Sequence, residues 1–396
     1  MSGFETLEVL MGALDGLRIV ELNRLLPGAF CTALLADHGA DVIVVEAPRF
    51  RDDAVVGEVP MVRRNKRHMA LDLKTETGRK VFLDLIEDAD VMVEAFRPGA
   101  AERLGLGYEA LSRLNPRLIY CSLTGYGQSG PLADRAGHDL NFMAVSGMLD
   151  LMRDGQGAPI VPKFQMSHLS GSLYAALGIM LALSAREKTG RGQYIDVSMT
   201  DALVSLLAMP LSFTFTGTPF AGRVANDLPE SFPCYRVYKT GDGEHISVGP
   251  LEPHLWAGLC AKLGCPQYAT LQYDAAARAE IEQHLEGLFL EKSLREWEEL
   301  LNDRDDCTAA VTRVSDLPRD AHLSARHMIH TTPEGIPEPG IAPVLSDTPG
   351  SFRRPAYRFG EHTAEILCEM GYSPEEITVL TDKGVIRLLE DTDESR

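Results

Sequence analysis

The chain has 396 residues, of which 45% are hydrophobic and 24% charged, and this composition is typical of a soluble globular protein of one or two domains. Its formal net charge of −19 argues against general nucleic-acid binding, because contacts to phosphate need a basic face. No run of eighteen apolar residues predicts a membrane-spanning helix and no export signal begins the chain, so we expect a cytoplasmic protein without a membrane partner.

The first elements predicted along the chain form a βαβ unit. The stretch "LRIVEL" at 17–22 is β-rich, "AFCTALLADHG" at 29–39 has helical spacing and ends in glycine, and "DVIVVEAP" at 41–48 is a second apolar strand. A crossover of this kind joins parallel strands. Further strand and helix patterns follow at 69–96, 116–131, 172–184 and 191–211. The sequence therefore predicts an α/β fold with a doubly wound, Rossmann-like parallel sheet.

The amino-acid composition changes after the segments that are predicted to form this sheet. We expect a large α/β domain over 1–212, a linker rich in Gly, Pro and Thr over 213–232, and a small α+β domain over 233–330. The small domain is expected to open with a hairpin, because "GDG" separates two alternating runs. Residues 331–396 form a C-terminal segment that is expected to return and pack on the large domain.

Several nucleotide and catalytic motifs are missing. "NRLLPGAF" follows the first strand with one glycine where a dinucleotide fold needs three, and GxxxxGK[ST], HExxH and GxSxG are absent. The seven cysteines lack CxxC spacing, which predicts free thiols and no metal site. A basic cluster, "RRNKRH" at 63–68, is either a solvated turn or a phosphate site. Arg97 follows a predicted strand, where ligands bind in open α/β sheets.

Three short polar stretches contain side chains that could transfer protons. His138 and Asp139 follow a Gly-rich loop, and histidine is the commonest proton-transfer side chain, although such a pair is often structural. Ser167 and His168 precede an apolar helix, where Ser167 could be an N-cap or the pair could use the positive end of the helix dipole. Glu252 stands before Pro253 and has the pattern of a helix start.

Taken in order, several stretches resemble the family III CoA-transferase superfamily, also called the CaiB/BaiF type, and most closely its α-methylacyl-CoA racemase branch. They cover roughly residues 15–330 and include "GADVIVVEAP", "RRNKRHMALDLK", "DVMVEAFRPGAAERLGLGYEAL", "AGHDLNFMAVSG" and "VGPLEPHLW". The resemblance implies an interlocked homodimer that acts on an acyl-CoA thioester, with no metal or other cofactor. It also implies coenzyme A contacts from the basic positions Arg64, Lys66, Arg67 and Arg97 and from the adjoining Pro98 and Gly99.

The resemblance further implies proton exchange at the carbon next to the thioester. His138 and Asp139 match the "GHD" motif of the racemase branch, whose histidine is one acid–base group, and Glu252 matches a glutamate that supports it. Both branches keep an aspartate at the start of the following helix. Ser167 falls there against the racemase pattern and His168 against the transferase pattern. We therefore expect a racemase-like enzyme that uses His138 and, in place of the aspartate, His168. CoA transfer, or a divergent lyase or hydrolase reaction on a CoA thioester, is the alternative.

Overall fold

The computed structural model describes residues 11–23, 26–50, 59–216 and 232–389, and the chain divides into two units. The first unit contains Met1–Leu207 and Ala325–Arg396, and the second contains Ala208–Ser324. The C-terminal stretch therefore belongs with the N-terminal part of the chain. The predicted linker over 213–232 lies mostly outside the described residues, and its first four residues end a helix, α9 (Ala208–Thr216).

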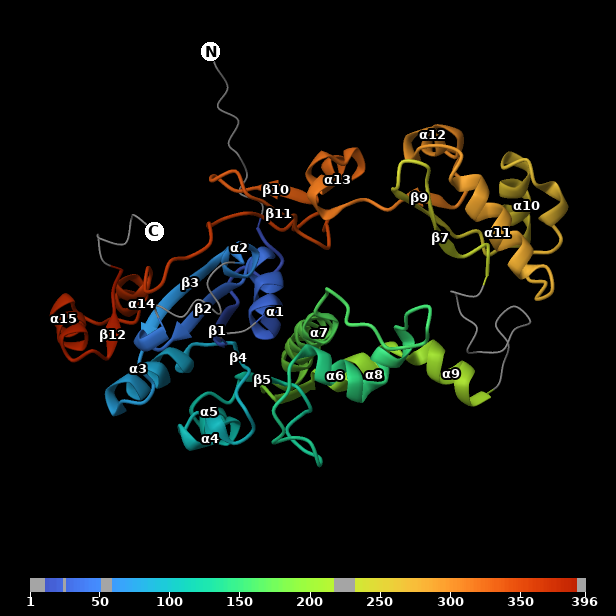
Figure 1. Cartoon of the computed structure of the whole chain (residues 1–396). Helices are drawn as coiled ribbons and strands as arrows, with labels where there is room; N and C mark the ends of the chain where they lie inside the picture. Colours follow the sequence, from blue (N-terminus) through green and yellow to red (C-terminus); the bar gives the residue numbers. More distant parts are fainter. Residues whose placement is uncertain (1–10, 24–25, 51–58, 217–231, 390–396) are drawn as a thin grey trace, which may run out of the picture. The chain divides into compact units, whose positions relative to one another are not determined.

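A seven-stranded sheet organises the first unit (Figure 1), with the order β12-β3-β2-β1-β4-β5-β6. The pairs among β1 to β6 are all parallel, and β12 joins β3 antiparallel. The order 3-2-1-4-5-6 is that of a doubly wound Rossmann sheet, so the predicted α/β class with a large parallel sheet is confirmed. The strands are β1 (Arg18–Leu22), β2 (Asp41–Glu46), β3 (Lys66–Leu71), β4 (Val91–Glu94), β5 (Ile119–Thr124), β6 (Tyr194–Ser198) and β12 (Ile386–Arg387).

Helices cover both faces of this sheet because its strands are apolar on both sides. On β1, Val20 and Leu22 belong to one buried cluster and Ile19 belongs to the other. The first cluster is covered by α3 (Glu76–Glu87), α5 (Tyr108–Leu114), α14 (Thr363–Glu369) and α15 (Pro374–Asp382). The second is covered by α1 (Leu26–Asp37) and α7 (Met166–Thr189). The short helices of the first unit are α2 (Pro60–Arg63), α4 (Ala100–Arg103), α6 (Asp139–Ser146) and α8 (Met199–Leu206), and α13 (Ala321–Ala325) lies at the boundary of the units.

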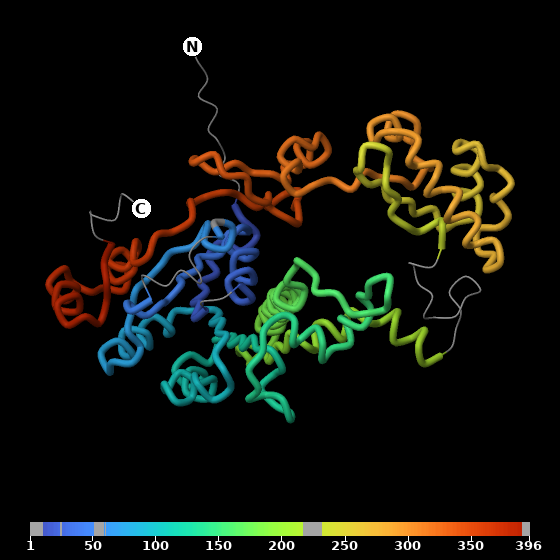
Figure 2. The backbone as a smooth tube through the Cα atoms, viewed as in Figure 1, coloured from blue at the N-terminus to red at the C-terminus, as the bar shows by residue number. Residues whose placement is uncertain are grey.

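The C-terminal segment lies beside the first strands of the sheet, as the tube in Figure 2 shows. The backbone N–H of Ala70 donates to Thr363 Oγ1 at 3.0 Å, and that of His68 donates to His362 Nδ1 at 3.1 Å. After α15 the chain continues into strand β12. A separate two-stranded sheet precedes this segment, formed by β10 (Ile329–Thr331) and β11 (Pro337–Pro339).

The second unit has its own core and a three-stranded antiparallel sheet, β7-β8-β9. The predicted hairpin is present as β7 (Arg236–Lys239) and β8 (His245–Val248), and β9 (Thr308–Ala310) pairs with β8. Besides α9, its helices include α10 (Pro253–Lys262), α11 (Arg278–Phe289) and α12 (Leu294–Leu300). Trp256 and Trp297 are almost fully buried in its core.

Helix α7 has the length and hydropathy that a membrane span would need, and the bent pair α8 and α9 passes the same test when taken together. A core helix of an α/β domain has these properties as well. Ala175, Ile179 and Ala182 of α7 pack against the sheet, while Leu173, Leu177 and Leu181 on another face are about half exposed.

Candidate active site

His138 and Asp139 stand at the start of α6, after the loop that leaves β5. His138 is the N-cap of α6, and its backbone N–H donates to the side chain of Asn141 at 3.0 Å. This bond holds the backbone at the helix start and leaves the imidazole exposed. Asp139 is the first residue of the helix.

Asp139 reaches across 28 residues of sequence to the first turn of α7. One of its carboxylate oxygens accepts hydrogen bonds from the backbone N–H of Ser167 at 2.9 Å and of His168 at 3.0 Å, and from the Ser167 hydroxyl. The first N–H groups of a helix have no partner within the helix, and the helix dipole favours a negative charge there. The structure therefore brings His138, Asp139, Ser167 and His168 together through this cap.

The interpretation of Ser167 as an N-cap is wrong. Gln165 is the N-cap residue of α7, and Ser167 lies inside the first turn, where it is fully buried. Its hydroxyl donates to Asp139 instead of accepting from the helix. Capping residues are recognised locally in a sequence, whereas this cap comes from the start of α6, so the sequence pattern did not reveal it.

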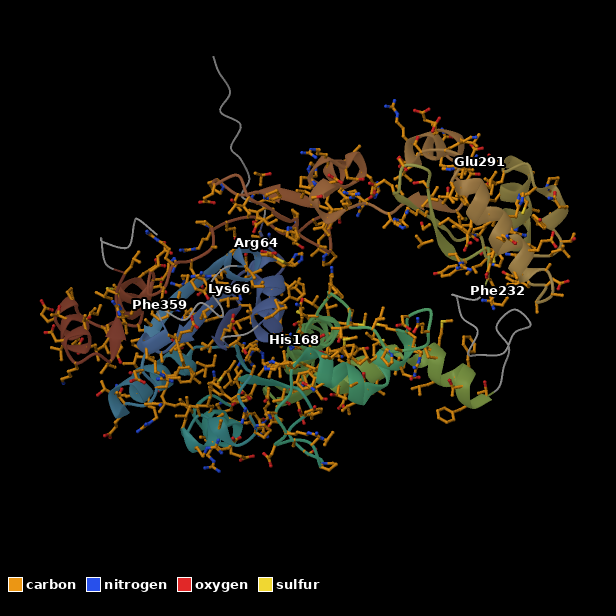
Figure 3. The ribbon with its side chains drawn as sticks, in the orientation of Figure 1. Arg64, Lys66, His168, Phe232, Glu291 and Phe359 are labelled. Carbon is orange, nitrogen blue, oxygen red and sulfur yellow. The ribbon has the colours of Figure 1, made fainter. Side chains whose placement is uncertain are left out.

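His168 lies partly buried beside this cap (Figure 3). Burial lowers the pKa of its imidazole, the carboxylate of Asp139 opposes that shift, and the charge of His138 lowers the pKa further. The ring of Phe142 is 6.3 Å away, centroid to centroid. Because the neutral form of His168 is favoured, this imidazole is suited to accept a proton at neutral pH.

Glu252 belongs to the second unit. It is the N-cap residue of α10, it is followed by Pro253 at the first helical position, and its side chain is exposed. The helix start that its pattern predicts is confirmed. Its support of His138 stays a prediction.

The basic cluster at 63–68 is neither a solvated turn nor an open phosphate site. Arg64 donates to both carboxylate oxygens of Asp37, at 3.1 and 2.7 Å, and lies 3.2 Å from Glu338 Oε1. The Lys66 ammonium lies 2.8 Å from Glu21 Oε2 and 2.7 Å from Thr32 Oγ1. The side chains of Arg64 and Lys66 are 2% and 0% exposed and lie within the fold (Figure 3).

Arg67 is also held by acidic residues. Its guanidinium binds Asp41 in two places and contacts Glu365 and Glu369 of α14. These hydrogen bonds raise its pKa above the ordinary arginine value despite partial burial. In this arrangement the donors of Arg64, Lys66 and Arg67 are directed at carboxylates inside the protein. Their expected contact with coenzyme A stays a prediction.

The turn after β4 is more open. Arg97 is exposed, Pro98 is half-buried, and Gly99 precedes α4 with a φ of 75°, a conformation that favours glycine. Their predicted contact with coenzyme A stays a prediction.

A cavity of about 400 Å³ lies at the carboxyl edge of β1 to β4. The residues that line it come from the strand ends and from the turns that follow them. They are Leu22, Asn23, Val45, Glu46, Ala47, Arg49, Phe50, Leu71, Asp72, Leu73, Lys74, Ala95, Phe96 and Leu104. Such an edge, at the point where strand order reverses between β1 and β4, is where open α/β sheets bind ligands.

Sequence reasoning missed Arg49 and Lys74 as possible ligand contacts. Each follows the end of a predicted strand within a few residues, and that position was the signal available for finding them. Within the described part of the chain, no group of three or more His, Cys, Asp or Glu side chains is arranged to hold a metal ion.

The model of CoA-transferase family III matches residues 14–363. The chain is 37% identical over 378 residues to the alpha-methylacyl-CoA racemase of Homo sapiens, covering 94% of this chain and 97% of that protein. It is 33% identical over 394 residues to the succinyl-CoA:glutarate CoA-transferase of Homo sapiens, covering 94% and 90%. A crystal structure of a CaiB/BaiF family protein from Brucella suis matches with a TM-score of 0.76 at 30% identity, over 91% of this chain and all of that one.

Proposed function

The chain belongs to CoA-transferase family III, and from that premise we propose that it exchanges the α-proton of an acyl-CoA thioester, as a racemase does. His138 and His168 are the proposed acid–base pair. The observation that supports the proposal is the cap by Asp139, which joins the start of α6, where His138 lies, to the start of α7, where His168 lies.

The chemistry needs one base on each face of the α-carbon. The lowered pKa of His168 supports its role as the neutral partner that removes the proton. A protonated His138 then returns a proton to the other face, which inverts the centre. Hydrogen-bond donors must also stabilise the enolate oxygen of the thioester.

The cavity at the carboxyl edge is the proposed site of the coenzyme A nucleotide. Arg49 and Lys74 supply cations for phosphate groups, and Leu22, Val45 and Phe96 supply apolar surface for a purine. Arg97 stays a further candidate for a phosphate contact. Coenzyme A enters as part of the substrate, and no other cofactor is proposed.

Covalent CoA transfer is the alternative. It needs a carboxylate nucleophile, and the carboxylate at the start of α7 is that of Asp139. Its oxygen Oδ1 already accepts from Ser167 and His168, which makes it a poor nucleophile. A lyase or hydrolase reaction on the thioester would instead use Ser167 or His168 to activate a leaving group or water.

We further propose a homodimer in the cytoplasm. Leu173, Leu177 and Leu181 of α7 recur at intervals of four residues and are 54%, 52% and 63% exposed. Soluble monomers rarely leave such a stripe open, and in a twofold dimer the same stripe meets its copy.

Deuterium exchange tests the proposed reaction. Incubation of a 2-methylacyl-CoA in D₂O should incorporate deuterium at the α-carbon, and His138→Gln and His168→Gln should each lower the rate by about 100-fold or more. The rate should also fall as the pH drops below the lowered pKa of His168, because protonation removes the base. His254→Gln, a histidine on α10 of the second unit, is the matched control and should exchange normally.

No exchange with any branched acyl-CoA would rule out the racemase proposal. Hydroxylamine trapping of an acyl-enzyme would favour CoA transfer. Release of free coenzyme A without a second acid would favour hydrolysis.

A further inference from the structure

Asn23 is a buried polar side chain that has no partner among the described residues. It directly follows β1 and is 4% exposed, and within that part of the chain neither its carboxamide nitrogen nor its oxygen has a hydrogen-bond partner. Buried polar groups are nearly always paired, since leaving them unpaired costs stability. Asn23 also lines the cavity at the carboxyl edge of the sheet. Its free donor and acceptor are therefore available to a ligand in that cavity.

The space for this carboxamide depends on a glycine. A Cβ atom at Gly28 would lie 2.0 Å from Asn23 Nδ2, so any larger residue there would displace the asparagine side chain. Gly28 is in the first turn of α1. The absence of a side chain at Gly28 therefore leaves room for the Asn23 carboxamide beside the first turn of α1.

The same turn is connected to α7. The hydroxyl of Ser172 donates to the carbonyl oxygen of Pro27 at 2.5 Å and lies 2.7 Å from that of His168. The segment that carries Asn23 therefore reaches the helix start where His168 lies.

Asn23 also lies where the cavity meets the carboxyl edge of the sheet. Leu22 and Val45, which line the cavity, belong to the buried cluster beneath α3 and α5. The Asn23 carboxamide lies against Gly28 of α1, and α1 packs with α7 on the other face of the sheet. Asn23 therefore lies between the cavity and the helix α1, whose first turn contacts α7 near His168.

In an acyl-CoA, the part between the nucleotide and the thioester is the pantetheine arm, which contains two secondary amides. We propose that Asn23 is a specificity-determining residue that pairs with these amides. Its Nδ2 donates to an amide carbonyl oxygen of one, and its Oδ1 accepts from the N–H of the other. This inference rests on the proposed function, because it takes the ligand to be an acyl-CoA.

Calorimetric titration of Asn23→Leu tests the inference. Leucine has a similar volume and neither polar atom. The variant should bind coenzyme A about 10- to 100-fold more weakly than the wild type, and should bind adenosine 3′,5′-bisphosphate, which lacks the arm, equally well. Without ligand, its melting temperature should equal or exceed that of the wild type, because an unpaired buried group has been removed. Equal weakening of both ligands, unchanged affinity for coenzyme A, or a lower melting temperature would overturn the inference.

Two further variants keep the test decisive. Asn23→Ala should show the same difference between the two ligands if the leucine variant does not fold. Gln272→Leu is the matched control: this buried carboxamide donates to Pro250 O at 2.8 Å, so its loss should lower the melting temperature and leave coenzyme A affinity unchanged. If the wild type binds neither ligand, the proposed function fails; if it binds both and Asn23→Leu matches it, only the role of Asn23 fails.

Discussion

Lys66 is a cation that this acidic protein keeps inside the fold. Its ammonium has three partners, Glu21 Oε2, Thr32 Oγ1 and the carbonyl oxygen of Ala29, all within 2.8 Å. Three partners satisfy the three donors of a lysine ammonium. The ion pair is buried between the sheet and α1. Removal of only one of its two charges would therefore leave the other buried and unpaired, which lowers the stability of the fold.

Replacing Lys66 with methionine should lower the free energy of unfolding by about 3–5 kcal/mol, because Glu21 would be left as an unpaired buried charge. Urea denaturation measures this loss. The double variant Lys66→Met with Glu21→Gln should recover much of it, since no charge then remains. If single and double variants lost the same stability, Lys66 and Glu21 would not act as a pair.

At the scale of elements, the start of α7 depends on the start of α6. Asp139 contributes two separable effects there. Its oxygen accepts the N–H groups of Ser167 and His168, and its charge raises the pKa of His168 against the effect of burial. An amide in the same place would keep the acceptor and remove the charge.

Asp139→Ala should therefore lower the free energy of unfolding by about 1–2 kcal/mol, as loss of a helix cap does. Asp139→Asn should retain most of that stability. In both variants the pKa of His168 should fall, so the acid limb of the deuterium-exchange rate should move to lower pH. NMR titration of His168 provides the direct measurement, and a shift to higher pH would contradict this account of the site.

For the whole molecule, the exposed stripe on α7 is the feature that a single copy leaves unexplained. The other side of that helix packs on the sheet through Ala175, Ile179 and Ala182, so rotation of the helix would not bury the stripe. In the proposed dimer, a second copy of the chain would cover this apolar stripe, with the leucines at the centre of the contact.

Leu177→Glu should halve the mass measured by light scattering, because a carboxylate would be buried at the centre of the dimer contact. Val379→Glu, on α15, is the control: Val379 is similarly exposed, and the dimer should persist. A monomeric wild type, or wild-type protein that floats with lipid vesicles, would refute the dimer as the reason for the exposed stripe.

The sequence by itself determined the family and the parallel sheet. Apolar runs such as 41–46, bounded by turns, leave few structures other than buried strands. The order of the family stretches indicated the family, and the match of the family model to residues 14–363 confirms it. Strand β12 was not predicted, because two residues have no periodicity and their pairing with β3 is decided at a distance.

Only the tertiary structure decided which polar groups are free. Arg64 and Lys66 looked like phosphate ligands in sequence, but Asp37, Glu338 and Glu21 neutralise them from distant positions. Asn23 has no distinguishing pattern in the sequence, yet folding leaves its carboxamide beside a cavity and unpaired among the residues that the structure describes. Local patterns reveal what a residue can bind. Which partner it meets depends on contacts between segments far apart in the chain, and these exist only in the folded protein.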